Sequence, residues 1–152
     1  MLIQILSIVV PILVYIVTPW VIRQLGGEPR RYRRLLIIAC LVFFISWYLP
    51  SPLIDGEDTS FTTHFVGGGI FTGLLWIYLK RSLDWHHVWW VEAFSLFALV
   101  SALGCINELF ELLTVCIGIS SIPLDDTNWD ILANTLGALV VYIIYRLYDT
   151  RH

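Results

Sequence analysis

The chain has 152 residues, of which 58% are hydrophobic and 14% are charged, with a formal net charge of −3 and a mean hydropathy of +0.78. These values lie outside the range of ordinary soluble domains and are typical of an integral membrane protein. The motifs of nucleotide-binding loops, serine hydrolases and zinc proteases do not occur in the sequence, which disfavours those enzyme classes, and we expect no nucleic-acid partner.

Five apolar segments are long enough to cross a hydrocarbon core of about 30 Å, which takes about 20 helical residues. In chain order, we predict helices at about 2–22, 35–54, 64–80, 89–117 and 128–147. Pro11 and Pro19 are expected to kink the first helix, and the length of the fourth indicates tilt. The predicted fold is an all-α integral membrane protein, a single domain of residues 1–152 with a bundle of five transmembrane helices.

The basic residues predict the orientation of this bundle, because Lys and Arg are retained on the cytoplasmic side during insertion. With the N-terminus outside and the C-terminus cytoplasmic, all nine fall on the cytoplasmic side: Arg23, Arg30, Arg31, Arg33, Arg34, Lys80, Arg81, Arg146 and Arg151. The Arg-rich loop fits a topology signal, which we favour, or contacts with anionic lipid headgroups.

Polar residues in three of the predicted spans share a helix face and a similar depth on the outer side. In the fourth span, Ser101, Gly104, Glu108 and Glu111 are spaced 3, 4 and 3 apart. In the fifth span, the spacings are 4, 4 and 3, for Asp126, Asp130, Asn134 and Gly137. The third span opens with His64, followed by Gly67, Gly68 and Gly69, which allow close packing of a neighbouring helix.

No Lys or Arg lies in the outer half of any predicted span, so salt bridges cannot neutralise these acids. Protonated carboxyls that share hydrogen bonds would neutralise them, and so would a divalent metal such as Mg, Mn, Ca or Zn. The sequence does not separate these two options. Haem ligation is disfavoured, because His64 is the only histidine near the outer end of a span. Cys40, Cys105 and Cys116 have neither disulfide nor zinc-site spacing and are predicted to be small core residues.

The predicted site residues follow from this convergence of polar faces. We assign hypothetical catalytic roles to His64, Glu108 and Asp130. The predicted ligand-binding residues are Glu108, Glu111, Asp126, Asp130 and Asn134. The predicted metal ligands are Glu108, Glu111 and Asp130.

The assembled motifs resemble the VanZ-like membrane family over about residues 60–147. The matching stretches are "THFVGGGIFTGLL", "NELFELL" and "DDTNWDILANTLGALV", the last carrying Asp130, Asn134 and Gly137. The sequence departs from that family before His64, where "FTT" replaces an Asp-Lys pair, and at Glu111, where the family has Gln. "ELFE" and "TNWD" are also similar to a YjdF-like inner-membrane family. The resemblance implies a multi-pass protein of the bacterial cytoplasmic membrane and a cell-envelope role.

Two functions of different classes fit these expectations. The first is a VanZ-like protein whose acid-rich pocket binds an envelope lipid, a glycopeptide-related ligand or a divalent metal. If it is an enzyme, we expect metal-assisted hydrolysis or transfer on a lipid-linked substrate. The second is a non-catalytic accessory or scaffold subunit of a larger membrane complex, with membrane lipids and other membrane subunits as partners. A proton- or ion-coupled carrier is less favoured, because the chain has no inverted repeat.

Overall fold

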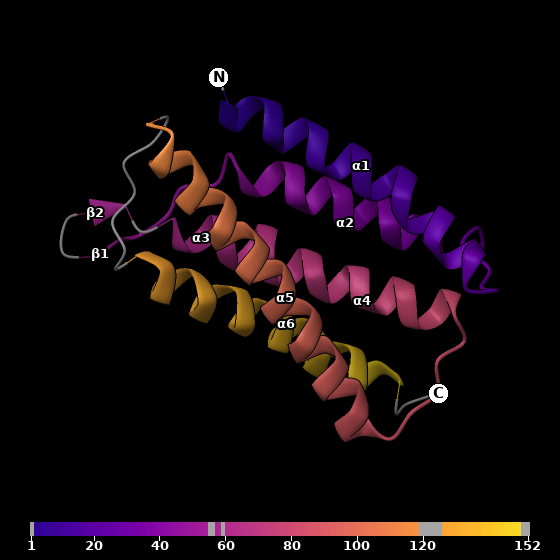
Figure 1. Cartoon of the computed structure of the whole chain (residues 1–152). Coiled ribbons are helices and arrows are strands. Elements are labelled where there is room, and N and C mark those ends of the chain that lie inside the picture. The colour runs from indigo at the N-terminus through magenta and orange to yellow at the C-terminus, as the bar shows by residue number, and fades with distance from the viewer. Residues whose placement is uncertain (1, 55–56, 59, 119–125, 150–152) are drawn as a thin grey trace.

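The computed structural model describes residues 2–54, 57–58, 60–118 and 126–149, and these are mostly helical. The helical segments are α1 (Leu2–Gln24), α2 (Arg33–Ser46), α3 (Phe61–Thr63), the π-helix η1 (His64–Ile70), α4 (Phe71–Ser82), α5 (Trp89–Cys116) and α6 (Asp126–Asp149). Because α3, η1 and α4 follow one another without a break, they form one continuous helix. Figure 1 shows the resulting helices lying roughly alongside one another, with α5 inclined across α6.

The predicted all-α class is confirmed, and three helices are long and apolar enough to cross a membrane. These are Ile5–Gln24, Trp89–Cys116 and Thr127–Asp149. Both prolines of the first helix lie inside α1, which continues through them to Gln24. An α-helix rises about 1.5 Å per residue, so the joined helix from Phe61 to Ser82 is about 33 Å long.

The second helix is shorter than the predicted 35–54, because α2 ends at Ser46. Pro50 and Pro52 follow within two turns. The residue before a proline disfavours the α conformation, and proline itself lacks the N–H that a helix needs. The chain instead forms a small antiparallel pair, β1 (Leu53–Ile54) with β2 (Glu57–Asp58), in which Leu53 is opposite Asp58.

The third helix begins with α3 at Phe61, before the predicted residue 64, and continues as the π-helix η1. Three successive glycines lie in η1, where neighbouring helices approach closely. A Cβ on Gly67 would overlap the Ser46 hydroxyl, and one on Gly69 would lie 2.7 Å from the Gly137 Cα. The predicted role of Gly67 to Gly69 in close packing is confirmed.

The η1–α4 helix lies at the centre of the bundle, between α2 on one side and α5 and α6 on the other. One buried core joins α4, α5 and α6 through Trp76, Leu96 and Val141. A second core joins α1, α2 and α4 through Ile22, Leu36 and Tyr78. Helix α1 packs on α2 at the edge of the bundle.

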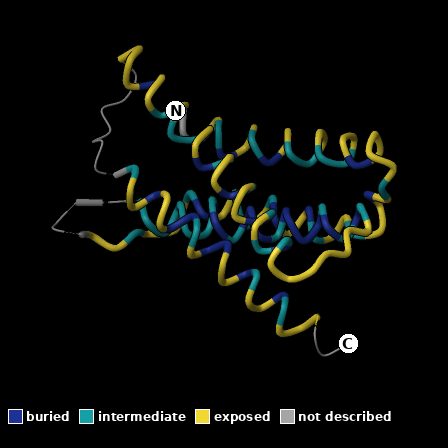
Figure 2. The backbone as a smooth tube through the Cα atoms, turned by 60° about the horizontal axis from the view of Figure 1, so that its bottom comes forward, coloured by how far each residue is buried: buried dark blue, intermediate teal, exposed yellow. Residues whose placement is uncertain are grey.

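The outer surfaces of the helices are apolar, as lipid requires, and Figure 2 shows α1 and α5 largely exposed. The predicted core position of the cysteines is wrong for two of them. Cys105 and Cys116 are exposed on α5, and Cys40 is half-buried. In a helix whose outer surface is apolar, a cysteine can serve as an apolar residue on the outside as well as in the core.

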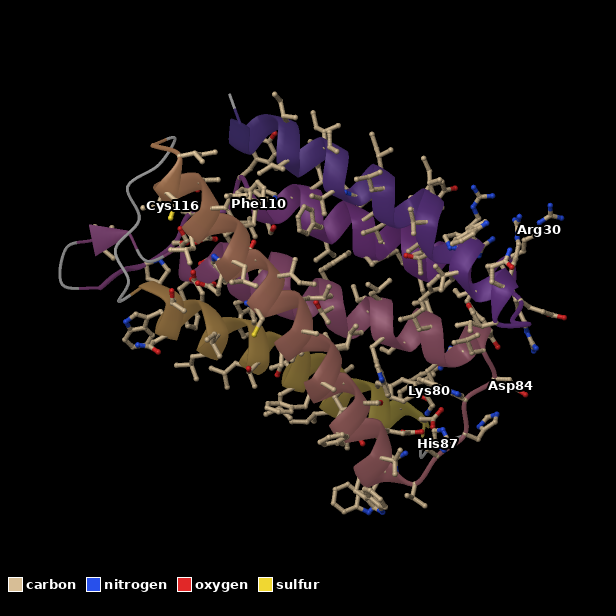
Figure 3. The ribbon with its side chains drawn as sticks, viewed as in Figure 1. Arg30, Lys80, Asp84, His87, Phe110 and Cys116 are labelled. Atoms are coloured by element: carbon tan, nitrogen blue, oxygen red, sulfur yellow. The ribbon has the colours of Figure 1, made fainter. Side chains whose placement is uncertain are left out.

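The two ends of the bundle carry different charges. At one end, here called the histidine end, α3 and α6 begin and α5 ends. At the other, the arginine end, α1 and α4 end, α2 begins and α6 ends. All described Lys and Arg residues belong to the arginine end, where Figure 3 labels Arg30 and Lys80.

Candidate functional site

A histidine and a buried aspartate meet at the histidine end, between η1 and α6. His64 is the first residue of η1, and Asp130 lies in the second turn of α6. His64 Nε2 is 3.2 Å from Asp130 Oδ2, a distance that fits a hydrogen bond or an ion pair. The Asp130 side chain is only 1% exposed and that of His64 is 14% exposed. The bundle therefore encloses the Asp130 carboxylate, whereas the neighbouring His64 ring is partly accessible.

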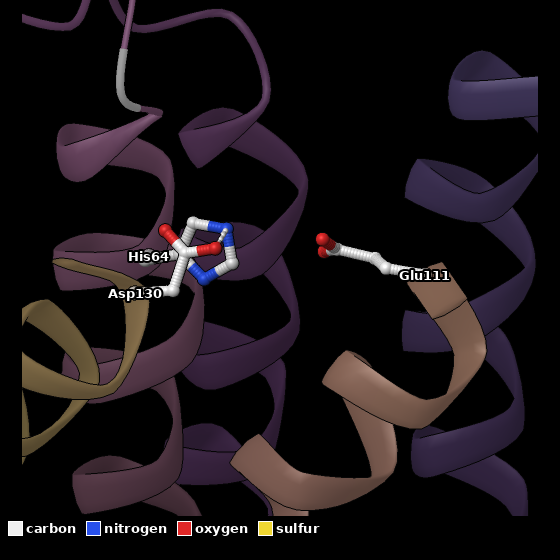
Figure 4. Close-up of side chains that lie close together, drawn as sticks. All are labelled: His64, Glu111 and Asp130. Carbon is white, nitrogen blue, oxygen red and sulfur yellow. Dashed lines mark ion pairs between the residues drawn. The ribbon is translucent and has the colours of Figure 1, made fainter. Parts of the chain in front are cut away.

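A third potential ligand comes from α5. Glu111 points from α5 toward His64 and Asp130, as Figure 4 shows. Each of the three side chains offers one ligand atom, and these atoms lie within 4.8 Å of one another. Asn107, one turn earlier on α5, donates a hydrogen bond of 2.6 Å from Nδ2 to Glu111 Oε1. We call His64, Glu111 and Asp130 the histidine–acid cluster.

The histidine–acid cluster has the chemistry and the size of a divalent cation site. An imidazole nitrogen with two carboxylates suits zinc or manganese, whereas magnesium and calcium prefer oxygen ligands. With metal–ligand bonds of about 2.1 Å, neighbouring ligand atoms are about 3 Å apart and opposite ones about 4 Å. The 3.2 Å between His64 and Asp130 matches neighbouring ligands, and the 4.8 Å limit requires only a small inward movement of Glu111.

A second polar layer lies one helical turn farther into the bundle. Asn134 follows Asp130 by four residues on α6 and is 5% exposed. Its carboxamide occupies the space beside Gly68 of η1, where a Cβ would overlap its oxygen. On the opposite side, a Cβ on Gly104 of α5 would lie 3.7 Å from Asn134 Nδ2. Two glycines from different helices therefore leave the room that this amide fills.

Asn134 Oδ1 and Glu108 Oε1 are among the buried side-chain atoms at this end of the bundle that have no hydrogen-bond partner among the described residues. A buried unsatisfied acceptor costs about 1–3 kcal/mol, so such atoms ordinarily meet a water, a proton donor or an ion. The interior at this end therefore contains unpartnered acceptors, and Trp47 Nε1, at the end of α2, is a buried donor without a partner among the described residues.

The structure gathers some of the predicted site residues and separates others. Glu111 and Asp130 are grouped with His64, whereas Glu108 lies outside this group of three with a buried carboxylate oxygen. Asn134 lies in the adjoining layer, and Ser101 of the predicted α5 face is exposed. Asp126 begins α6, but its side chain lies outside the described residues. Glu111 joins the group and Glu108 does not, because side chains three residues apart on a helix differ by about 60° in direction and about 4.5 Å in depth.

A charged cluster at the arginine end was not predicted from the sequence. Lys80 Nζ lies 2.5 Å from Glu92 Oε1 and donates to the Tyr145 hydroxyl at 2.7 Å. Arg146 Nη1 lies 3.6 Å from the other Glu92 oxygen. Lys80 and Glu92 are 6% and 4% exposed. Glu92 could have indicated this cluster from the sequence. It lies in the first turn of α5, and the neighbouring helices α4 and α6 carry basic residues in their last turns.

Comparisons with protein-family models, with curated proteins and with solved structures find no match to this chain. The function is therefore inferred from the chain's own geometry and charge. The histidine–acid cluster is the feature that carries most of this inference, because its three side chains come from three helices and converge on one point.

Proposed function

We propose that the chain is a small multi-pass membrane protein that binds a divalent metal ion in the histidine–acid cluster, near the outer membrane face. The observation that carries this proposal is the convergence of one imidazole and two carboxylates, from η1, α5 and α6, within 4.8 Å. None of the described Lys or Arg residues belongs to that end of the bundle. A cation is the simplest way to balance two carboxylates there.

We propose that the chain crosses the membrane five times, with the N-terminus outside and the C-terminus cytoplasmic. Besides α1, α5 and α6, the continuous helix from Phe61 to Ser82 has the length of a membrane crossing. Helix α2 is about 21 Å long, so it is the shortest of the five proposed spans. The clustering of the described basic residues at one end agrees with the positive-inside rule. The bacterial inner membrane is proposed on the VanZ-like resemblance.

The ligand that best suits such a metal is a phosphate-bearing lipid headgroup of the outer leaflet. Three protein ligands leave coordination positions open on the ion, and phosphate oxygens are suitable ligands for them. The second layer would then assist: the buried oxygens of Glu108 and Asn134 can accept hydrogen bonds from hydroxyl or amine groups of the headgroup. If the protein is catalytic, the metal would polarise the phosphate, and Glu108, which is not one of the three proposed ligands, would transfer the proton.

Metal analysis of the purified full-length protein tests this proposal. Metal content is measured by mass spectrometry after purification without chelator, and the melting temperature is measured with and without EDTA. We expect about one divalent ion per chain and a lower melting temperature after chelation, because a ligand that binds only the folded state stabilises it. Glu111→Gln and Asp130→Asn should lose the ion.

Asp84→Asn is the matched control, because it also removes one carboxylate charge, and Asp84 is 91% exposed at the arginine end. This variant should keep the ion. A wild-type protein with no bound ion and no response to EDTA would contradict the proposal. The histidine–acid cluster would then be a hydrogen-bonded interior, as expected for the alternative of a non-catalytic accessory or scaffold subunit.

A further inference from the structure

The loop between α1 and α2 is held rigidly against the end of α4. Tyr78, which is fully buried, donates from its hydroxyl to the carbonyl of Pro29 at 3.1 Å. The Glu28 N–H donates to the Ser82 carbonyl at 2.8 Å. Gly27 lies so close to α4 that an added Cβ would be 2.5 Å from the same carbonyl. These contacts hold the backbone that carries Arg30 beside the end of α4.

A groove runs along the outside of this loop and continues onto α1. Its lining includes three arginines and the side chains between them: Tyr15, Pro19, Arg23, Pro29, Arg30 and Arg33. The Arg33 guanidinium lies over the Tyr15 ring, 4.8 Å from its centroid. A cation–π contact of this kind orients the guanidinium and leaves its N–H groups available to a ligand.

The positive charge of the groove is not neutralised within the described chain. Arg23, Arg30 and Arg33 are exposed, and none of them has a carboxylate within 4.0 Å among the described residues. The loop's one acid, Glu28, lines the adjoining hollow together with Arg23, Arg30 and Arg31, but forms no ion pair with them among the described residues. Three guanidinium groups around one groove are therefore available to an external anion, and a phosphate offers the bidentate partner that arginine prefers.

The surface next to the groove indicates where that phosphate comes from. One to three turns before Arg23, α1 exposes Ile12, Ile16 and Trp20, which are 52%, 61% and 60% exposed. An exposed apolar helix surface in a membrane protein is covered by acyl chains, and tryptophan favours the headgroup level. A ligand that has a phosphate at one end and hydrocarbon at the other fits both surfaces at once.

We propose that this groove is a binding site for the headgroup of an anionic phospholipid, with its phosphate held by Arg23, Arg30 and Arg33 and its acyl chains along α1. The site lies at the opposite end of the bundle from the histidine–acid cluster and shares no residue with it. In the proposed orientation, the groove faces the inner leaflet. There, each basic residue contributes about 1 kcal/mol to the binding free energy of anionic lipid, which corresponds to about fivefold in affinity.

Native mass spectrometry of the detergent-purified full-length chain tests this site. The protein is titrated with phosphatidylglycerol, with phosphatidylcholine or with inorganic phosphate. We expect saturable binding of phosphatidylglycerol at least tenfold tighter than that of phosphatidylcholine. Arg30→Gln and Arg33→Gln should each weaken the phosphatidylglycerol complex about fivefold. The exposed Arg34 lies outside the groove lining, so Arg34→Gln, which removes the same charge, should change the affinity less than twofold.

Three results would overturn the proposal. Equal binding of the two lipids would show that charge recognition is absent. Competition by millimolar inorganic phosphate would identify a free-anion site. A loss in Arg34→Gln equal to that in Arg33→Gln would show a diffuse charge effect without a defined groove. Unchanged melting temperatures of the variants would establish that folding is intact, as expected for exposed arginines.

Discussion

His64 and Asp130 lie 3.2 Å apart across the contact between η1 and α6, with the aspartate almost completely enclosed. This contact lies near the beginnings of the two helices, and it places a nitrogen and a carboxylate close to Glu111 of α5. A buried carboxylate is costly unless a partner or an ion stabilises it. The pair therefore connects the packing of the bundle with the proposed chemistry.

The packing around Asn134 predicts different effects for two glycine substitutions. A Cβ at position 68 would overlap the Asn134 oxygen, whereas a Cβ at position 104 would make an ordinary contact of 3.7 Å. We expect Gly68→Ala to lower the free energy of unfolding by about 1–3 kcal/mol through overpacking. Gly104→Ala should be neutral or raise it by up to about 1 kcal/mol, because alanine favours the helix. Reversible unfolding in mixed micelles measures both, and equal effects would refute the placement of Asn134.

Asn107 is predicted to position Glu111 without binding the metal itself. It donates to the Glu111 carboxylate at 2.6 Å from one turn away. Loss of such an outer partner typically reduces metal affinity by about 10–100-fold. We therefore expect Asn107→Leu to bind the ion at least tenfold more weakly in competition with a metal-sensitive dye. The matched variant Asn128→Leu, at an exposed position of α6, should retain full affinity. Equal affinities of the two variants would exclude a positioning role.

The buried ion pair at the arginine end predicts strong coupling between Lys80 and Glu92. Lys80→Met leaves the Glu92 carboxylate with only the longer contact to Arg146, and should destabilise the protein by about 3 kcal/mol. The double variant Lys80→Met/Glu92→Leu should recover most of that loss, because no charge would then be buried without its partner. The free energies of unfolding of the single and double variants measure the coupling. Additive losses would show that the two side chains act independently.

The proposed orientation predicts the behaviour of reporter fusions in a bacterial host. Alkaline phosphatase is active only outside the cytoplasm, so a fusion after Gly118, at the histidine end, should be active. A fusion after Asp84, at the arginine end, should be inactive and should fluoresce when green fluorescent protein replaces the phosphatase. The reverse pattern would invert the bundle and place the histidine–acid cluster on the cytoplasmic side.

The sequence was sufficient to predict the helical class and much of the polar convergence. Spacing placed Asp130, Asn134 and Gly137 on one face of a helix, and all three are buried against the bundle. That face could be predicted because a helix repeats every 3.6 residues and polar groups avoid lipid. The end of α2 was missed because an apolar run was extended through two prolines that stop a helix.

What the sequence could not provide was the relative rotation of helices that are far apart in the chain. Glu108 and Glu111 are both partly buried on the side of α5 that faces the bundle. Only the packing of α5 against η1 and α6 decides which of them faces His64. The pairing of Lys80 with Glu92 was missed for a similar reason. Basic residues at the ends of spans were interpreted as topology signals, and one buried acid among them changes that interpretation.

Pulsed electron paramagnetic resonance with Mn²⁺ tests the central claim most directly. After replacement of the native ion with Mn²⁺, electron spin echo modulation from a ¹⁴N nucleus reports an imidazole bound to the metal. We predict this modulation in the wild-type protein and in Asp84→Asn. It should disappear in His64→Gln, in which Glu111 and Asp130 still hold the ion more weakly. A bound Mn²⁺ without nitrogen modulation, or modulation that persists in His64→Gln, would contradict the assignment of His64, Glu111 and Asp130 as the metal site.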